Sequence, residues 1–190
     1  MSYHIRKATI DDIPELIELT YKAYEPIRKL KINFAATHPT TELVMDNIKE
    51  NQCFLLIDDN RIISTLSVRM PWSKNPGPYG FPHIWWFATS PDYGKSGTGS
   101  YLLNYVEQEI ILKDWHSPAV TLGTATSHPW LVDMYIRKDY RPFGSADLGS
   151  GHTTQYMIKV LDKNRFKSFR AIREEAKDFI VFESSDNHGD

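Results

Sequence analysis

Three glycines, Gly94, Gly97 and Gly99, lie close together in the middle of the chain. The apolar residues 84–88 precede them and predict a strand, and the residues that follow place apolar side chains at helical spacing. The first turn of a helix has backbone N–H groups without partners, and the helix dipole is positive there. Because glycine has no Cβ, a phosphate can approach such a turn closely. The segment therefore indicates a site for a phosphate-bearing ligand, and the alternative is a plain glycine turn before a helix.

The spacing of these glycines excludes two common phosphate-binding motifs. A dinucleotide fingerprint has the order G-x-G-x-x-G, whereas this chain has G-x-x-G-x-G. A P-loop requires Lys and then Ser or Thr after its last glycine, and here Ser100 and Tyr101 follow Gly99. The pattern that remains resembles motif A of the GCN5-related N-acetyltransferases (GNAT), in which R/Q-x-x-G-x-G/A holds the pyrophosphate of acetyl-CoA.

This resemblance implies acetyl-CoA as the co-substrate. Gly97 and Gly99 match the glycine pair of the motif, whereas Gly94 stands where the family usually has Arg or Gln. One side-chain contact to the phosphates is therefore absent, and the neighbouring Lys95 is the group that can supply charge. The residues implied to hold the pyrophosphate are Lys95, Ser96, Gly97, Thr98, Gly99 and Ser100.

A second segment, residues 134–140, carries a candidate acid. It reads Met-Tyr-Ile-Arg-Lys-Asp-Tyr and resembles the L-Y-x-k-x-G-F segment of the family, whose tyrosine lies near the thioester sulfur. Tyr135 is therefore the expected catalytic acid, which protonates the departing thiolate, and a cofactor contact. Asp139 replaces the family's glycine, and we expect this to be tolerated because Asp adopts the left-handed conformation more easily than most residues. The alternative for Tyr135 is a core side chain on an amphipathic helix.

Two histidines are further candidates. His128 stands seven residues before Tyr135, where the family often has an asparagine that bonds the pantetheine arm, and its alternatives are a helix cap and a base. The family often places a basic carboxylate on the strand before the glycine turn, but residues 83–87 contain no acid. His83 is the only titratable group there and is the candidate base. The alternatives are that His83 is a satisfied surface residue and that the proton leaves through water.

The strand before the glycine turn is expected to bind the cofactor through its backbone. An open strand edge can accept a peptide-like arm as an extra strand, so Phe87, Ala88 and Thr89 are expected to hydrogen-bond the pantetheine amides. Side chains alternate along a strand, so Trp85 and Trp86 are expected on opposite faces. One of the two would then lie in the core and the other would line the acceptor cleft.

The composition indicates an ordinary globular protein. The 190 residues are 41% apolar and 24% charged, and the net charge of −2 gives no general attraction to nucleic acid. A single cysteine, Cys53, excludes an internal disulfide. Because no long apolar run and no apolar leader occur, we expect a cytoplasmic protein without a membrane span. No set of His, Cys, Asp and Glu has metal-ligand spacing, so no metal is expected.

The periodicity predicts alternating strands and helices. Helices are expected over residues 11–27, with Asp11 as the cap, and over residues 41–50, and another opens at residues 127–130 with Pro129 in its first position. Strands are expected at residues 5–8, 52–57, 61–69, 84–88, 119–124, 140–143 and 153–160, with loops at 29–39 and 71–82. This order resembles the GNAT fold, an α/β fold with a mixed central sheet of about seven strands flanked by helices.

Residues 1–160 are thus expected to form an acetyltransferase domain, and residues 161–190 an amphipathic helix with a disordered end, residues 184–190. The helix would pack on the domain or on a second subunit, and the alternative is a lid over the cleft. A homodimer is possible.

The resemblance implies direct transfer of an acetyl group from acetyl-CoA to the primary amine of a small molecule or peptide. The acceptor itself is not identified, because loops 29–40 and 71–82 would determine it. The alternatives are a non-catalytic acyl-CoA-binding or regulatory protein on the same fold and an enzyme that uses a longer acyl donor.

Overall fold

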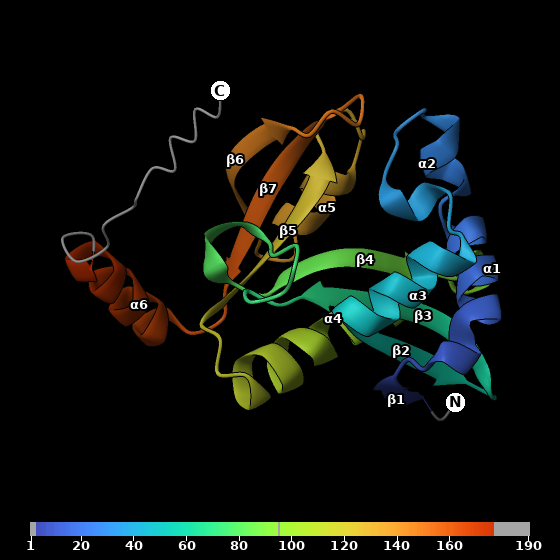
Figure 1. Ribbon diagram of the computed structural model, residues 1–190, viewed down its shortest axis with the longest axis horizontal. Helices are drawn as coiled ribbons and strands as arrows, with labels where there is room; N and C mark the ends of the chain where they lie inside the picture. Colours follow the sequence, from blue (N-terminus) through green and yellow to red (C-terminus); the bar gives the residue numbers. More distant parts are fainter. Residues whose placement is uncertain (1–2, 95, 177–190) are drawn as a thin grey trace, which may run out of the picture.

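The computed structural model describes residues 3–94 and 96–176, and its centre is one mixed sheet of seven strands (Figure 1). Along the sheet the order is β1-β2-β3-β4-β5-β7-β6. All neighbours are antiparallel except β4 and β5, which are parallel. The strands are β1 His4–Lys7, β2 Gln52–Asp58, β3 Arg61–Arg69, β4 His83–Thr89, β5 Ala119–Ala125, β6 Arg141–Asp147 and β7 Thr153–Val160. The predicted mixed sheet flanked by helices is confirmed.

Helices cover both faces of this sheet. They are α1 Ile13–Ala23, α2 Glu25–Lys29, α3 Thr41–Glu50, α4 Thr98–Tyr105, α5 Leu131–Ile136 and α6 Lys163–Ala176. The chain continues from α4 into a π-helical segment, Val106–Asp114. Short 3₁₀ turns lie at Ile10–Asp12, Ala35–Thr37, Pro78–Gly80 and Pro91–Tyr93.

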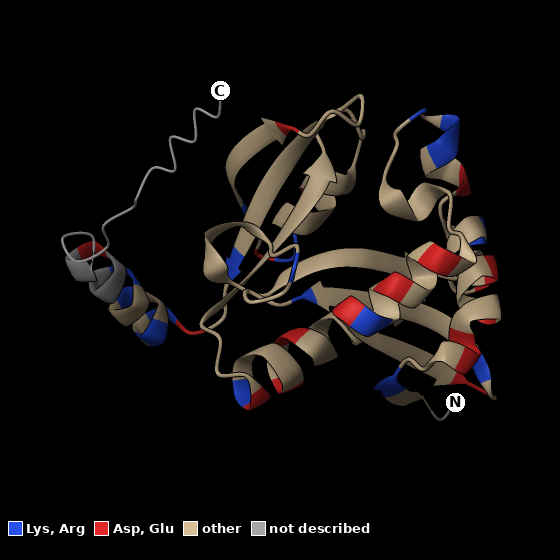
Figure 2. Ribbon diagram, viewed as in Figure 1, with Lys and Arg blue, Asp and Glu red and all other residues tan. Residues whose placement is uncertain are grey.

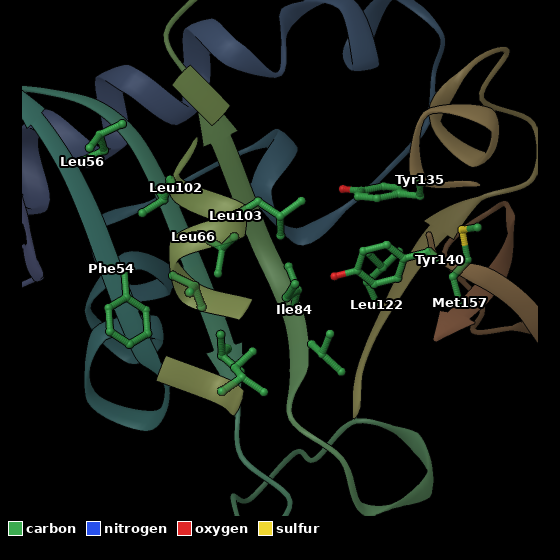
Figure 3. Packing of buried hydrophobic residues seen from close by; sticks show 14 of the residues in the cluster. Phe54, Leu56, Leu66, Ile84, Leu102, Leu103, Leu122, Tyr135, Tyr140 and Met157 are labelled. Atoms are coloured by element: carbon green, nitrogen blue, oxygen red, sulfur yellow. The ribbon is translucent and has the colours of Figure 1, made fainter. Parts of the chain in front are cut away.

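Strand β2 shows how the core is divided. Cys53 and Leu55 pack in a cluster with residues of α1 and α3, whereas Phe54 and Leu56 pack in a second cluster with residues of α4 (Figure 3). Alternate side chains of one strand point to opposite faces, so β2 is buried on both sides. This explains why its sequence is a continuous apolar run.

The sheet opens between β4 and β5. Their parallel pairing covers only His83 with Thr121 and Ile84 with Leu122. On the other side of β4, Ser67 pairs with Trp86 and Val68 with Ile84, so Trp85 is an extra residue in the ladder. Such a bulge bends the strand that carries it. The bend coincides with the point where β4 leaves β5, and no strand of the described chain pairs with the β5-facing edge beyond it.

The bulge corrects the prediction that Trp85 and Trp86 lie on opposite faces. Both rings pack with the cluster under α1 and α3, with their centroids 5.4 Å apart. A strand alternates only while its ladder is regular, and the extra residue shifts the alternation by one. Trp86 is buried and Trp85 is only partly buried.

Two predicted helix starts are wrong by a few residues. Thr9, not Asp11, precedes the first turn, and the Asp12 carboxylate accepts a hydrogen bond from the Thr9 backbone N–H at 2.7 Å. Helix α5 begins at Leu131 rather than Pro129, because residues 126–130 form turns first. The hairpin, the helix at residues 41–50 and the loop at residues 71–82 follow the predictions.

The C-terminal helix α6 begins at Lys163 and packs against a loop of the domain. The rings of Phe166 and Phe169 lie 5.7 and 4.8 Å from the ring of Phe81, centroid to centroid. This contact agrees with packing on the domain. The rest of the expected C-terminal segment, including the expected disorder of residues 184–190, lies outside the described residues. Among the described helices, none has the length and apolar character needed to cross a membrane.

Candidate active site

The glycine turn places the N-terminus of α4 beside the end of β4. Gly97 precedes the helix with a φ of +83°, a conformation that side chains disfavour. A Cβ on Gly99 would stand 2.6 Å from Thr89 Oγ1 and 3.4 Å from Phe87 Cζ. Only glycine therefore lets α4 approach β4 this closely. The hydroxyl of Ser96 donates to the Tyr93 carbonyl at 2.6 Å.

The position that the family fills with Arg or Gln has no side chain in this chain. The backbone N–H of Gly94 donates to the Pro91 carbonyl at 3.0 Å, so this part of the loop is a closed turn. Lys95 lies outside the described residues. Instead, Lys138 extends from the end of α5 and donates its ammonium to the Ser100 hydroxyl in the first turn of α4. Sequence patterns could not identify this contact, because it spans 38 residues.

A cavity of about 710 Å³ lies where β4 and β5 separate. The residues predicted on β4 and α5 line it: His83, Phe87, Ala88, Thr89 and Tyr135. The described residues of the glycine turn, and His128, do not line it. Its wall also includes residues of α1 and α2, of the loops at residues 33–36 and 75–78, and of β7 with the loop before it. Both loops that the sequence suggested as acceptor determinants therefore border the cavity.

Tyr135 lies on α5 with its ring buried and its hydroxyl directed toward β4 (Figure 3). Its ring packs edge-on against Tyr140, with 5.6 Å between the centroids. Burial raises the pKa of Tyr135, and the nearby Tyr24 and Glu107 raise it further. The phenol therefore keeps its proton throughout the physiological pH range and can act as a hydrogen-bond donor.

The end of α5 fixes the direction of this tyrosine. Asp139 has a φ of +68°, which confirms the left-handed conformation expected there. The backbone N–H of Tyr140 donates back to the Tyr135 carbonyl at 3.0 Å, as in a Schellman-type helix end. The Tyr140 hydroxyl in turn donates to the buried Glu107 carboxylate at 2.6 Å, and Lys159 pairs with the same carboxylate.

His83 is buried, with only 5% of its surface exposed, so the alternative of a surface residue is wrong. Its Nδ1 lies 2.9 Å from the Thr121 hydroxyl, across the short parallel ladder. Burial lowers the pKa of His83 to about 3, and the positive charge of Arg69 adds to this effect. The imidazole is therefore neutral at physiological pH and holds a proton poorly.

His128 adopts the capping arrangement that was one of its alternatives. Its Nδ1 accepts long hydrogen bonds from the backbone N–H groups of Trp130 at 3.4 Å and Leu131 at 3.3 Å. Burial lowers the pKa of His128, which keeps this nitrogen unprotonated and able to accept. The ring thus occupies the start of α5 and supports the helix that carries Tyr135.

A residue that sequence reasoning missed contacts the open part of β4. The Tyr24 hydroxyl donates to the Phe87 carbonyl at 3.0 Å, and burial raises the pKa of Tyr24 to about 12. On the other side, the Ser64 hydroxyl donates to the Ala88 carbonyl at 2.9 Å. Tyr24 appeared in the sequence only as part of a helical apolar face. Its role at β4 depends on a contact across 63 residues.

The comparisons with known proteins agree with this geometry. The model of the acetyltransferase (GNAT) family matches residues 13–138, and the chain therefore belongs to this family. A Bacillus subtilis S-(2-succino)cysteine N-acetyltransferase is 53% identical over 161 residues, which cover 85% of this chain and 98% of that protein. A Bacillus subtilis S-alkylcysteine N-acetyltransferase is 40% identical over 162 residues, 85% of this chain and 90% of that protein. The protein is accordingly an N-acetyltransferase.

Solved structures share the fold at low sequence identity. The PaiA N-acetyltransferase of Thermoplasma acidophilum, solved in complex with coenzyme A, superposes with a TM-score of 0.65 at 18% identity. The match covers 84% of this chain and 99% of that chain. The ribosomal-protein-S18-alanine N-acetyltransferase of Escherichia coli gives 0.64 at 13% identity, over 85% and 95% of the two chains. In the described part of this chain, no group of three or more His, Cys, Asp or Glu is arranged to hold a metal ion.

Proposed function

We propose that this enzyme transfers the acetyl group of acetyl-CoA directly to the primary amine of an S-substituted cysteine or a closely related small molecule. The observation that carries the proposal is the opening between β4 and β5. A buried, protonated Tyr135 lines this opening, and the glycine turn before α4 adjoins β4. The acceptor class is suggested by the two cysteine-derivative acetyltransferases at 53% and 40% identity.

In this proposal the N-terminus of α4 binds the pyrophosphate. Residues 97–100 offer backbone N–H groups at the positive end of the helix, and Gly99 allows a close approach. Lys138 supplies the positive charge that the family usually draws from the position of Gly94. We extend the same role to Lys95 because it adjoins the turn. The pantetheine arm would lie along Phe87, Ala88 and Thr89 on the edge of β4 that faces β5.

The chemical step needs little from the protein beyond position and one proton donor. The neutral amine attacks the thioester carbonyl carbon, so a C–N bond forms and the C–S bond breaks. Tyr135 gives its proton to the departing thiolate sulfur and is then reprotonated from water. The cavity holds the two reactants next to each other, which supplies much of the rate enhancement.

The proton of the amine leaves through water rather than through His83. A base with a pKa of about 3 cannot hold a proton at neutral pH, which argues against the role first expected for this histidine. His83 instead borders the cavity as a neutral, hydrogen-bonded group. The proposal therefore assigns it no proton transfer.

Replacement of Tyr135 by Phe tests the proposal. We expect kcat to fall about a hundredfold, the order of magnitude typical of a lost general acid. The affinity for CoA should stay within about twofold, because the ring and its packing remain. Steady-state thiol release with S-methylcysteine gives kcat, and calorimetric titration gives the affinity for CoA.

The exposed Tyr21, which lies outside the cavity lining, offers a matched control. Tyr21→Phe should match the wild type in both measurements. An unchanged kcat in Tyr135→Phe would remove Tyr135 from the mechanism. A wild-type protein that binds acetyl-CoA but acetylates no amine would favour the binding-only alternative.

A further inference from the structure

We propose that Arg69 binds a carboxylate of the acceptor and makes the enzyme select anionic amines over neutral and cationic ones. This inference rests on the proposed function, since it concerns the acceptor side of the same cavity. The ligand chemistry is a carboxylate carried by a small amine. It comes either from the α-carboxylate of an amino acid or from the substituent on sulfur.

Arg69 is held at the acceptor end of the cavity. It is the last residue of β3, pairs in register with His83 at the start of β4, and lines the cavity. Its guanidinium carbon lies 3.9 Å from the centre of the Trp85 ring. This stacking holds the flat group in one plane while its N–H groups at the edge stay available. The bulge that places Trp85 beside the cavity therefore also supports Arg69.

Among the residues that the structure describes, no carboxylate pairs with this charge. The Arg69 guanidinium makes no ion pair and no hydrogen bond with the residues that the structure describes. By contrast, Arg6 pairs with Asp12, and Arg28 donates to two backbone carbonyls. A half-buried guanidinium without a counter-ion is costly unless a ligand supplies the negative charge.

The other described lining residues of the cavity do not oppose this positive charge. Among its described lining residues, Arg69 is the only Lys, Arg, Asp or Glu. Strands β4 and β5 carry no Lys, Arg, Asp or Glu, and the acidic side chains lie on other elements, α1 and α3 among them (Figure 2). A cationic acceptor would find no carboxylate in this cavity, whereas an anionic acceptor would find one fixed cation.

The positive charge of Arg69 and the neutral state of His83 are linked. Burial lowers the pKa of Arg69 to about 10, which still leaves the guanidinium charged at neutral pH. Its charge in turn helps to keep His83 neutral. The cavity also contains the hydroxyl of Thr124, which is buried without a hydrogen-bond partner among the described residues. Both groups are available to a polar ligand, and Arg69 provides the charge.

The test compares three probes in calorimetric titrations of the CoA-loaded protein. S-(2-succino)cysteine carries an α-carboxylate and two carboxylates on its substituent, S-methylcysteine carries only the α-carboxylate, and S-methylcysteine amide carries none. For Arg69→Gln we expect binding of S-(2-succino)cysteine to weaken at least tenfold. Binding of the amide and of CoA should stay within about twofold. If binding of S-methylcysteine weakens as well, Arg69 contacts the α-carboxylate. If only binding of S-(2-succino)cysteine weakens, Arg69 contacts a carboxylate of the substituent.

Arg61, at the opposite and exposed end of the same strand, gives the matched control. Arg61→Gln should bind all three probes as the wild type does. If Arg69→Gln fails to fold, Arg69→Lys keeps the charge but loses the planar pair of donors, and we expect a smaller loss confined to the acidic probes.

Two outcomes separate the inference from the proposed function. Equal binding of S-(2-succino)cysteine by the wild type and by the folded Arg69 variant overturns the role of Arg69 and leaves the acetyltransferase proposal intact. A wild-type protein that binds CoA but neither binds nor acetylates any of the three probes overturns the acceptor class, and the inference falls with it.

Discussion

His83 shows that a residue type suited to act as a base can lie in surroundings that prevent it from accepting a proton. Its type and its position before the glycine turn suggested a base. The fold buries the imidazole beside Arg69 and lowers its pKa to about 3. The same burial predicts how stability depends on pH, because the unfolded chain would hold the histidine with a pKa near 6.5.

We expect acid to destabilise the protein partly through His83. Between about pH 3 and pH 6.5 the unfolded state binds a proton here that the native state does not, so stability falls as the pH falls. The loss is about 1.4 kcal/mol for each pH unit below 6.5, or about 2 kcal/mol at pH 5. Urea unfolding at several pH values from 7.5 to 5 measures this slope in the wild type and in His83→Gln.

The His83→Gln variant should show a flatter curve than the wild type in that window. Exposed His4 provides the comparison, and His4→Gln should follow the wild type. Parallel curves for the wild type and His83→Gln would contradict the assigned environment of His83.

The sequence predicted single residues well where a local rule applied. Asp139 was expected to be left-handed because it stands at a helix end, and its φ of +68° confirms this. Asp11 was expected as a helix cap, but Thr9 takes that position, and the carboxylate that bonds back to the Thr9 N–H is that of the neighbouring Asp12. Two adjacent aspartates satisfy the same local rule, and only the path of β1 into the helix distinguishes them. Arg69 and Tyr24 gave no local sign, since their partners lie elsewhere in the chain.

At the scale of elements, the start of α4 and the end of α5 are in contact, and we propose that they act as one site. The two helices are separated by a strand, yet Lys138 reaches Ser100 across the interval. Hydrophobic periodicity predicted both helices but not their contact, because periodicity identifies a buried face and not its partner. The bulge at Trp85 was missed for a related reason. Regular alternation is assumed in any strand prediction, and an inserted residue has no signature of its own.

Lys138 is expected to contribute to CoA binding. Lys138→Gln should raise the dissociation constant for CoA roughly three- to tenfold, since the lost charge is partly exposed and screened by solvent. Because the contribution is electrostatic, the difference between the variant and the wild type should shrink as salt is added. Calorimetric titration with CoA at low and high salt measures both effects.

Lys113 is a matched control because it is exposed on the π-helical segment and pairs with Glu109 there. Lys113→Gln should bind CoA as the wild type does. Equal CoA affinities for Lys138→Gln and the wild type at low salt would show that the helix terminus alone is sufficient.

At the scale of the whole molecule, residues 1–160 contain the sheet and its core, whereas the C-terminal helix only packs against them. All seven strands lie before residue 161, and α6 contacts the domain through Phe166 and Phe169 on Phe81. Phe81 belongs to the loop at residues 71–82, part of which lines the cavity. We propose that residues 1–160 fold as a domain and that α6 steadies this loop.

A chain that ends at Asp162 tests this division. It should fold, with a free energy of unfolding lower by about 1–3 kcal/mol because the aromatic contacts on Phe81 are lost. Trypsin should cleave after Lys74, in the same loop, faster than in the full chain. Full-length Phe166→Ala/Phe169→Ala should reproduce the faster cleavage. A truncated chain that does not fold would contradict the domain boundary.

The opening between β4 and β5 has a consequence for solubility. An unpaired strand edge is ordinarily a hazard, since the edge of another chain can add to it and begin aggregation. Here the free edge of β4 lies inside the sheet, because the pairs at His83 and Ile84 close one end of the opening and join β4 to β5. A second protein strand would have to enter between two strands of one sheet, whereas a slender ligand needs far less room. The protein can therefore leave part of a strand edge open to a ligand without offering that edge to its neighbours in a crowded solution.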